Sequence, residues 1–521
     1  MNLLMLCPFG AVRDYLYPMV ALGRELTRAG HSLTFVHCDK ALRTGCTAMN
    51  ALGVPDDAQL REKEDVCRKC TEASRAVASL EAWETRWLTT EKETKKNLSS
   101  GINTFLQRSF AYELLLQAKS EHPPRFGRIS QMWKRRHRAL VSLWPQVKRI
   151  INEKSFDAVI CYNSLYGVHR MFWKAAQIHK IPFFSLHHST NAGTQDEFFL
   201  VRDEAFMCLR ELQKNFHRLP SASREDEKAI HIHDQAMYDS RKLWSYSSAK
   251  AQTPSQQPKG NYDKKVLVCL SSQDEVFAAQ FIGVFPKAAG KHAFRDQIKW
   301  VRWVRDLAKR YPRVLFWIRP HPRLYPNKRE GQLSELAVHL DREKKAGGPT
   351  NFFWPESHEQ GSVWSHLGNT DVLFNAWSSL ADDFGKNGTP VLTFFPEYSN
   401  SGRKVDLSAS TSSGYEKIFN KVITSPEVFS NAEAHKKWRA HYLRANTFQL
   451  LQNRDPLTRL YSKFVPAHEK PKWDIRGLFK RPNRMHREVS KIEKILMQVP
   501  RAHKKRNDWL SFDLYRKGFP G

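Results

Sequence analysis

Short apolar runs alternate with helical patterns from the first residues of this chain. Leu3 to Cys7 is apolar, Pro18 to Ala29 has helical spacing, and Ser32 to His37 is apolar again after a helix stop at Gly30. A strand, a helix and a strand in that order form a βαβ unit, which places the two strands in a parallel sheet. The pattern predicts an α/β domain at the amino terminus.

The same alternation returns after a long helical region. Residues from about 60 to 150 are charged and helical in pattern, with few strand signals. Ala158 to Cys161 then has the character of a buried strand, Val168 to Lys180 of a helix, and Ile181 to Leu186 of a further strand. We expect this half, residues 1–245, to be one Rossmann-like domain with a helical insertion at about 60–150.

A second set of strands begins after a polar segment. Residues 246–262 are rich in Ser, Pro and Gln and lack periodicity, as is typical of a linker between domains. Lys265-Val-Leu-Val-Cys-Leu then starts a new buried strand, and Phe294 to Arg310 a helix. We predict a second Rossmann-like domain at 263–425, followed by helices and a basic tail at 426–521.

Two strand ends in the second domain carry the most informative chemistry. The apolar strand Val314 to Ile318 breaks at Arg319-Pro-His-Pro, and the strand Val372 to Phe374 leads into Ser378-Ser379 and a short helix. Ligands of open α/β sheets bind at the carboxyl ends of the strands. Serines at a helix start cap its free amides, and the same amides favour a phosphate. The pattern predicts a nucleotide-phosphate site.

These motifs resemble the nucleotide half of certain bacterial GT-B transferases. An Arg-x-His-Pro element, a strand, Ser-Ser, an acidic residue and Gly-x-Pro occur here in that order. They are similar to capsule and surface-polysaccharide glycosyltransferases, including sialyl- and Kdo-transferases with HP and SS motifs, and to CDP-glycerol glycerophosphotransferases. The resemblance covers residues 262 to 400 well, and the amino-terminal half only in general plan.

The resemblance implies a GT-B fold, with two Rossmann-like domains facing a cleft, and a set of donor contacts. His321, Ser378 and Ser379 would contact the donor phosphate, and Asp383 matches the acidic position after the serines. Arg319, judged from its own chemistry, could neutralise the phosphate by charge-assisted hydrogen bonds or equally form a surface ion pair. A simple capping role for the serine pair is compatible with this function. The resemblance favours a CMP-linked donor, such as Kdo or a sialic acid.

The acceptor would lie against the amino-terminal domain. An inverting transfer needs a general base near the acceptor hydroxyl, and Asp, Glu and His can serve. Asp14 follows the first strand and His188 follows the strand ending at Leu186, so these two are our candidates. The sequence alone does not place either one against the donor.

The charge balance points to an anionic partner. The chain has 83 basic and 53 acidic residues, a net charge of +30, which favours polyanions or an anionic lipid surface. Basic residues concentrate in Trp133-Lys-Arg-Arg-His-Arg138 and in the tail from about Ala467. Apolar residues beside lysines and arginines in the tail fit a helix on a membrane surface, and equally a helix packed on its own protein.

Four cysteines form a candidate structural zinc site. Cys38, Cys46, Cys67 and Cys70 include one C-x-x-C pair, so their spacing resembles a zinc site without matching a standard one. The alternative is a set of scattered reduced thiols, because disulfides are disfavoured in the cytosol. No cofactor is expected for catalysis.

Several enzyme classes lack their sequence signatures here. The chain has no P-loop, no GxGxxG after the first strand, no HExxH and no GxSxG, which argues against a kinase, a dehydrogenase and a serine hydrolase. No apolar run reaches the length of a membrane span, and the first residues fit a core strand better than a signal peptide. We expect a cytoplasmic protein, at the inner face of the membrane if the tail binds lipid.

The sequence therefore favours a glycosyltransferase. It would move a sugar from a nucleotide-activated donor to a growing surface or capsular polysaccharide, with a glycan or lipid-linked glycan as acceptor. A CDP-glycerol or CDP-ribitol phosphotransferase is the nearest alternative. A basic nucleic-acid-binding protein is an alternative of another class, but the chain lacks RRM, KH and zinc-finger signatures, so no nucleic-acid partner is expected.

Overall fold

A computed structural model describes residues 1–449, with gaps at 91–97, 123–126, 189–196, 204–212, 214–215, 239–257, 259, 286–291, 327–330, 356–362 and 400–403. The predicted tail from Ala467 and most of the predicted linker, 246–262, lie outside the described residues.

The amino-terminal half is built on a seven-stranded sheet in the order β12-β6-β5-β4-β1-β2-β3. Its parallel part, β5-β4-β1-β2-β3, has the Rossmann strand order. β6 and β12 extend one edge in antiparallel fashion. The strands are β1 (Asn2–Leu6), β2 (Ser32–Asp39), β3 (Glu84–Thr89), β4 (Ala158–Tyr162), β5 (Phe183–His188), β6 (Glu197–Arg202) and β12 (Thr447–Gln449).

Both faces of this sheet are covered by helices. In β1, Leu3 and Met5 belong to one buried cluster and Leu4 and Leu6 to another, because successive side chains of a strand point to opposite faces. The covering helices are α1 (Arg13–Arg28), α2 (Thr47–Ala51), α3 (Leu60–Glu81), α4 (Ser100–Ala118), α5 (Gly127–Glu153) and α6 (Gly167–Ile178).

The second half repeats the plan with a five-stranded parallel sheet in the order β11-β10-β7-β8-β9. When the strands are numbered along this half alone, the order is 5-4-1-2-3, which is again the Rossmann order. The strands are β7 (Lys264–Cys269), β8 (Val314–Arg319), β9 (Phe352–Phe353), β10 (Val372–Asn375) and β11 (Val391–Thr393), and the helices are α9 (Gln273–Phe281), α10 (Gln297–Arg310), α11 (Glu335–Lys345), α12 (Leu380–Lys386) and α13 (Ser412–Thr424).

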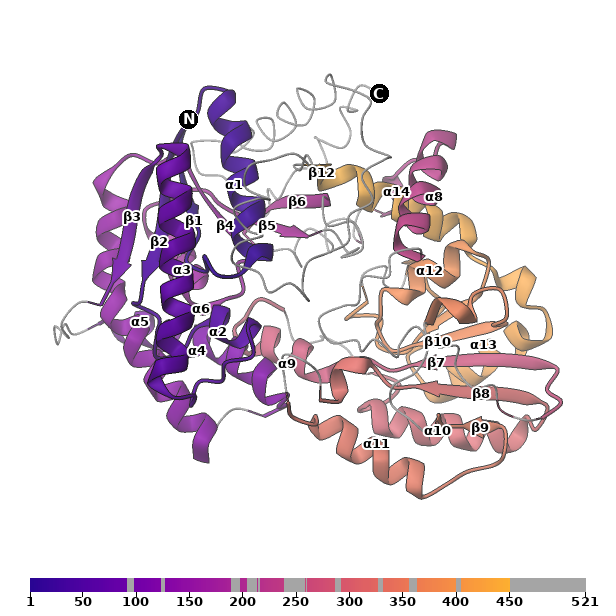
Figure 1. The fold of residues 1–521 in the computed structure, drawn as a ribbon. Coiled ribbons are helices and arrows are strands. Elements are labelled where there is room, and N and C mark those ends of the chain that lie inside the picture. Colours follow the sequence, from indigo (N-terminus) through magenta and orange to yellow (C-terminus); the bar gives the residue numbers. More distant parts are fainter. Residues whose placement is uncertain are drawn as a thin grey trace.

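α8 (Arg224–Tyr238) lies in the chain between the strands of the first and the second sheet, and α14 (Ala432–Asn446) follows the second sheet. These two helices pack on each other, and α14 also packs on α12. Directly after α14 the chain enters β12, which pairs with β6 of the first sheet. Figure 1 shows the two sheets in separate lobes, with α14 running from the second lobe towards β12 in the first. The described carboxyl-terminal segment therefore packs back across both halves.

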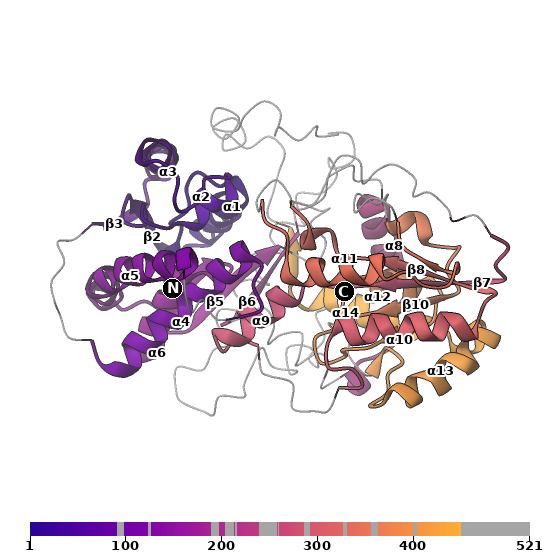
Figure 2. The same cartoon turned by 90° about the horizontal axis from the view of Figure 1, so that it is seen from below.

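A second contact between the halves lies at α4 and α9, which are neighbours in both views (Figures 1 and 2). Ala111 and Leu115 of α4 share a buried cluster with Val276 and Ala279 of α9. Apolar burial therefore joins the first half to the loop region after β7.

The predicted fold class, α/β with two Rossmann-like sheets, is confirmed by the two strand orders. The region at about 60–150 is mostly helical, as expected, but it also holds β3, which pairs in parallel with β2 and completes the first sheet. The exact domain limits stay predictions.

One residue of the basic cluster on α5 is structural. The side chain of Arg136 is fully buried and makes two hydrogen bonds of 2.6 Å to the carboxylate of Asp56. A guanidinium paired in this way holds α5 to the loop before α3, and it is not available to an external polyanion. Across the part of the chain that is described, no helix is both long and apolar enough to cross a membrane.

Candidate functional site

Both predicted motifs lie at one edge of the second sheet. Arg319 of β8 is in register with Cys269 of β7, and Cys269 is in register with Asn375 of β10. The two motifs therefore start one strand to either side of β7. Two strand spacings separate the backbones of Arg319 and Asn375 by about 10 Å. That edge is the carboxyl end of a parallel sheet, where ligands of this architecture bind.

The ring of His321 is held in one orientation by two hydrogen bonds to Nδ1. The backbone N–H of Arg323 donates to Nδ1 over 3.3 Å, and the hydroxyl of Ser272, just after β7, lies 3.0 Å from the same nitrogen. A nitrogen that accepts a backbone N–H carries no proton, so the neutral ring carries its proton on Nε2. His321 thereby becomes an oriented donor through Nε2.

Positive charge surrounds this imidazole. Burial, together with the nearby cations Arg323, Arg319 and Lys119, lowers the pKa of His321 from 6.5 to about 3. Burial also lowers the pKa of Arg319 to about 10, which leaves it charged at neutral pH. A neutral hydrogen-bond donor among cations suits an anionic ligand, because desolvated charges act strongly on a phosphate.

The serine turn after β10 is shaped by Asn375. Its side chain accepts from the backbone N–H of Ser378 over 3.0 Å and donates to the carbonyl of Ser378 over 3.1 Å. Ser378 is partly buried, and its hydroxyl accepts from the N–H of Leu380 over 3.4 Å, as the capping prediction required. Ser379 is exposed at the N-cap position of α12, and the described helix start receives no capping bond from its hydroxyl.

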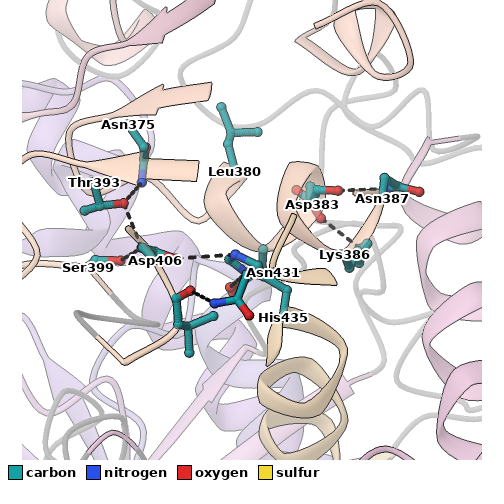
Figure 3. Close-up of polar contacts among 12 residues, drawn as sticks. Asn375, Leu380, Asp383, Lys386, Asn387, Thr393, Ser399, Asp406, Asn431 and His435 are labelled. Atoms are coloured by element: carbon teal, nitrogen blue, oxygen red, sulfur yellow. Dashed lines mark hydrogen bonds and ion pairs between the residues drawn. The ribbon is translucent and has the colours of Figure 1, made fainter. Parts of the chain in front are cut away.

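Asp383 lies within α12 and takes part in a buried ion-pair group (Figure 3). Figure 3 shows its carboxylate beside Nζ of Lys386, at 3.1 Å. The same Nζ contacts Asp234 of α8 at 2.6 Å. Lys386 is the last residue of α12 and is only 7% exposed. These contacts fix α12 against α8. Contact between Asp383 and a donor stays a prediction.

A second group of buried polar side chains includes His435 of α14 and connects that helix to α12 (Figure 3). The hydroxyl of Thr393 donates to Asp406 over 2.7 Å, and His435 of α14 lies between Asp406 at 3.6 Å and Asp382 of α12 at 3.5 Å. A side chain at Gly385 would overlap the imidazole of His435, so α14 can lie this close to α12 only with glycine there. The serine turn therefore leads into α12, a helix that is held in place by contacts with both α8 and α14.

The two candidate bases lie on the first sheet. Asp14 is the second residue of α1, and His188 ends β5. The side chains of both fall outside the described residues, so their catalytic role stays a prediction. The carboxyl edge of that sheet is aromatic: the hydroxyls of Tyr15 and Tyr166 are 2.8 Å apart, and His187 stacks on Tyr162.

The four candidate zinc cysteines are buried and lie close enough to influence one another electrostatically. Burial, with a smaller contribution from the neighbouring cysteines, raises the pKa of Cys38 and of Cys70 from 9.0 to about 12. Cys70 also accepts a hydrogen bond from the N–H of Ala11 over 3.0 Å. Within the described residues, no group of three or more His, Cys, Asp or Glu side chains is arranged to hold a metal. Structural zinc stays a prediction, and elemental analysis of the purified chain tests it.

The structure adds four residues that the sequence analysis did not select: Ser272, Arg323, Lys119 and Asn375. Ser272 and Asn375 could have been found, because each stands at the carboxyl end of an apolar strand, as the selected motifs do. Lys119 follows a helix of the other half, and only the packing of α4 on α9 brings it to His321.

Comparisons with known proteins give a distant likeness in structure only. No family model and no curated protein sequence matches. Among solved structures, the calicheamicin glycosyltransferase CalG4 is 12% identical, covering 85% of this chain and 94% of its own, with a TM-score of 0.28. A UDP-GlcNAc 2-epimerase from Neisseria meningitidis, bound to UDP-GlcNAc, is 12% identical, with 85% and 97% covered and a TM-score of 0.33.

The spinosyn rhamnosyltransferase SpnG, complexed with thymidine diphosphate, is 11% identical, with 85% and 96% covered and a TM-score of 0.26. Identities and TM-scores this low carry no argument about activity. The fold assignment rests on the strand orders of the two sheets.

Proposed function

We propose that this protein is a glycosyltransferase that moves a sugar from a nucleotide-activated donor to a glycan. The observation that carries the proposal is the convergence of Arg319, His321 and the Ser378 turn on one sheet edge, on either side of β7. The second sheet would hold the donor and the first sheet the acceptor.

The chemistry follows from the charges at that edge. Breaking a sugar–phosphate bond leaves negative charge on the departing nucleotide, and fixed donors aimed at that charge lower the barrier. Arg319 would supply a cation, His321 a hydrogen bond from Nε2, and the turn at Ser378 its hydroxyl and nearby amides. Such a donor set can stabilise the leaving group without a metal ion.

Asp14 and His188 are the proposed bases on the acceptor side. One of them would take the proton of the acceptor hydroxyl as it attacks the sugar. The Arg-x-His-Pro and Ser-Ser elements further favour a CMP-linked donor of the Kdo or sialic acid kind, and a surface or capsular polysaccharide as acceptor.

Product mass tests the proposal. The purified chain is incubated with CMP-Kdo, CMP-sialic acid or CDP-glycerol and a panel of oligosaccharide acceptors, and the products are analysed by mass spectrometry. We expect an acceptor heavier by one sugar, with activity lost in His321→Ala and retained in His339→Ala. The control histidine is exposed on α11 of the same half.

Two results would contradict the proposal. An acceptor heavier by glycerol phosphate would identify a phosphotransferase instead. Equal activity of the two histidine variants would remove His321 from the site.

A further inference from the structure

Arg323 joins three segments that meet beside His321. Its guanidinium pairs with Asp274 of α9 and lies 3.5 Å from Glu275, while its backbone N–H donates to Nδ1 of His321. Asp274 stands two residues after Ser272, which contacts the same imidazole. The ion pair therefore fixes α9 and the turn η3 (Pro322–Leu324) relative to each other. It thereby also fixes the two groups that orient His321, the hydroxyl of Ser272 and the backbone N–H of Arg323.

The same guanidinium also reaches the other half of the molecule. It donates to the carbonyl of Leu116, near the carboxyl end of α4, over 2.9 Å. The last carbonyls of a helix lack partners within it and form its negative end, so a cation there is favourable. Arg323 supplies that cation from the second half.

A reciprocal contact runs in the opposite direction. Lys119, just after α4, donates from Nζ to the carbonyl of Tyr325 over 2.6 Å. Arg323 is 4% exposed, and Lys119 and Asp274 are 0% and 2% exposed. Removing the partner of a charge buried this deeply strongly destabilises the folded protein, because water cannot take the place of the partner. The turn that carries His321 and the end of α4 are thus fastened together by two buried cations.

We propose that Arg323 is a positioning residue that couples the phosphate site at His321 to the contact between the two halves. The inference rests on the proposed function, because it assigns a nucleotide phosphate to His321. A nucleotide at His321 stabilises the contact with α4, and the contact stabilises the bound nucleotide. Such coupling is reciprocal, so either side can be used to measure it.

The first test is a double-mutant cycle for nucleotide binding. Isothermal titration calorimetry with CMP and UDP is carried out on the full chain, on His321→Ala, on Arg323→Met and on the double variant. We expect Arg323→Met to weaken binding at least tenfold in the wild-type background and less than threefold in the His321→Ala background, because its effect passes through His321. Equal loss in both backgrounds would overturn the positioning role.

Two further variants separate positioning from general damage. Arg323→Lys keeps the charge but cannot span Asp274 and Leu116 together, so we expect binding between that of the wild type and Arg323→Met. Arg302→Met removes another arginine–carboxylate pair of the same half, with Glu343, and should bind as the wild type does. Equal losses in Arg302→Met and Arg323→Met would overturn the role.

Hydrogen–deuterium exchange tests the coupling without a nucleotide. In Arg323→Met, exchange should rise both in residues 321–325 and in residues 115–120, on opposite sides of the contact. A rise in only one segment would overturn the coupling. Failure of the wild-type chain to bind CMP and UDP would contradict the proposed function, and the exchange result would still decide whether Arg323 joins the two halves.

Discussion

The hydroxyl of Ser272 lies 3.0 Å from Nδ1 of His321, although 49 positions separate the two residues in sequence. β7 and β8 are parallel neighbours, so the residues that follow them meet at one edge of the sheet. The contact joins the loop after β7 to the predicted phosphate motif after β8 and, with the N–H of Arg323, sets the proton of His321 on Nε2.

Removing this hydroxyl should weaken nucleotide binding without unfolding the chain. Ser272→Ala loses one neutral hydrogen bond, a net of about 0.5–1.5 kcal/mol, so we expect a two- to tenfold weaker CMP or UDP affinity by calorimetry. Ser271→Ala is the control, because the hydrogen bonds of Ser271 to Gln297 are made by its backbone. If both serine variants bind nucleotide equally well, Ser272 does not orient the histidine.

Loss of the Ser378 and Ser379 hydroxyls should have a larger effect than loss of the Ser272 hydroxyl. Exchanging both Ser378 and Ser379 for Ala removes the two hydroxyls that we propose contact the donor phosphate. Losing a hydrogen bond to a charged group costs roughly 1.5–3 kcal/mol, on the order of tenfold to a hundredfold in rate. The measurement is glycosyl transfer at saturating acceptor. Ser412 and Ser413 form a second serine pair at the start of α13, and their double Ala variant serves as control. Full activity of the Ser378 and Ser379 variant would remove these hydroxyls from the site.

Close packing of α14 on α12 gives a prediction about stability. Gly385→Ala would place a methyl group against the imidazole of His435, and overpacking of this kind costs about 1–3 kcal/mol. Gly101→Ala, in α4, meets no atom within 4 Å of the added group and should be neutral or slightly stabilising. Chemical unfolding of both variants checks this. An unchanged free energy of unfolding in Gly385→Ala would mean that α14 does not pack so closely on α12.

His37 gives a prediction about pH. Burial lowers its pKa from 6.5 to about 4, although a hydrogen bond to the carbonyl of Cys7 opposes the shift. The unfolded chain therefore binds the proton first as pH falls. The contribution of His37 to the free energy of unfolding is fully present above pH 6.5. It is lost as the pH falls towards 4, with a slope of up to about 1.4 kcal/mol per pH unit.

A matched variant isolates that effect. His37→Phe keeps an aromatic ring beside Phe35 and Trp87 but cannot titrate. Urea unfolding between pH 7 and pH 4.5 should show a shallower loss of stability in this variant than in the wild type. Parallel pH profiles of the two proteins would show that His37 titrates normally in the folded chain.

The sequence predicted those parts of the fold that depend on local pattern. Apolar runs such as Leu3 to Cys7 and Val314 to Ile318 marked buried strands, and the residues after them marked the ligand edge, because strand ends and turns are set by nearby residues. β3 was missed because Glu84–Thr89 is neither uniformly apolar nor regularly alternating. Among the described strands it pairs along one edge, with β2.

Residues that act through tertiary contacts could not be predicted in this way. Nothing local distinguishes Arg136, which is buried against Asp56, from the exposed Arg135 and Arg138 beside it on α5. In the same way, Lys119 reaches the turn after His321 only because α4 of one half packs on α9 of the other. Pairing between residues about 80 or 200 positions apart depends on the whole topology, which a periodicity does not encode.

Nucleotide titration tests the central claim most directly, because the claim is a phosphate site at His321. Isothermal titration calorimetry with CMP, CDP, UDP and TDP is carried out on the wild-type chain, on His321→Ala and on the control His339→Ala. We predict that at least one nucleotide binds the wild type and the control equally and binds His321→Ala at least tenfold more weakly. Binding of none of the four, or equal binding to all three proteins, would contradict the account.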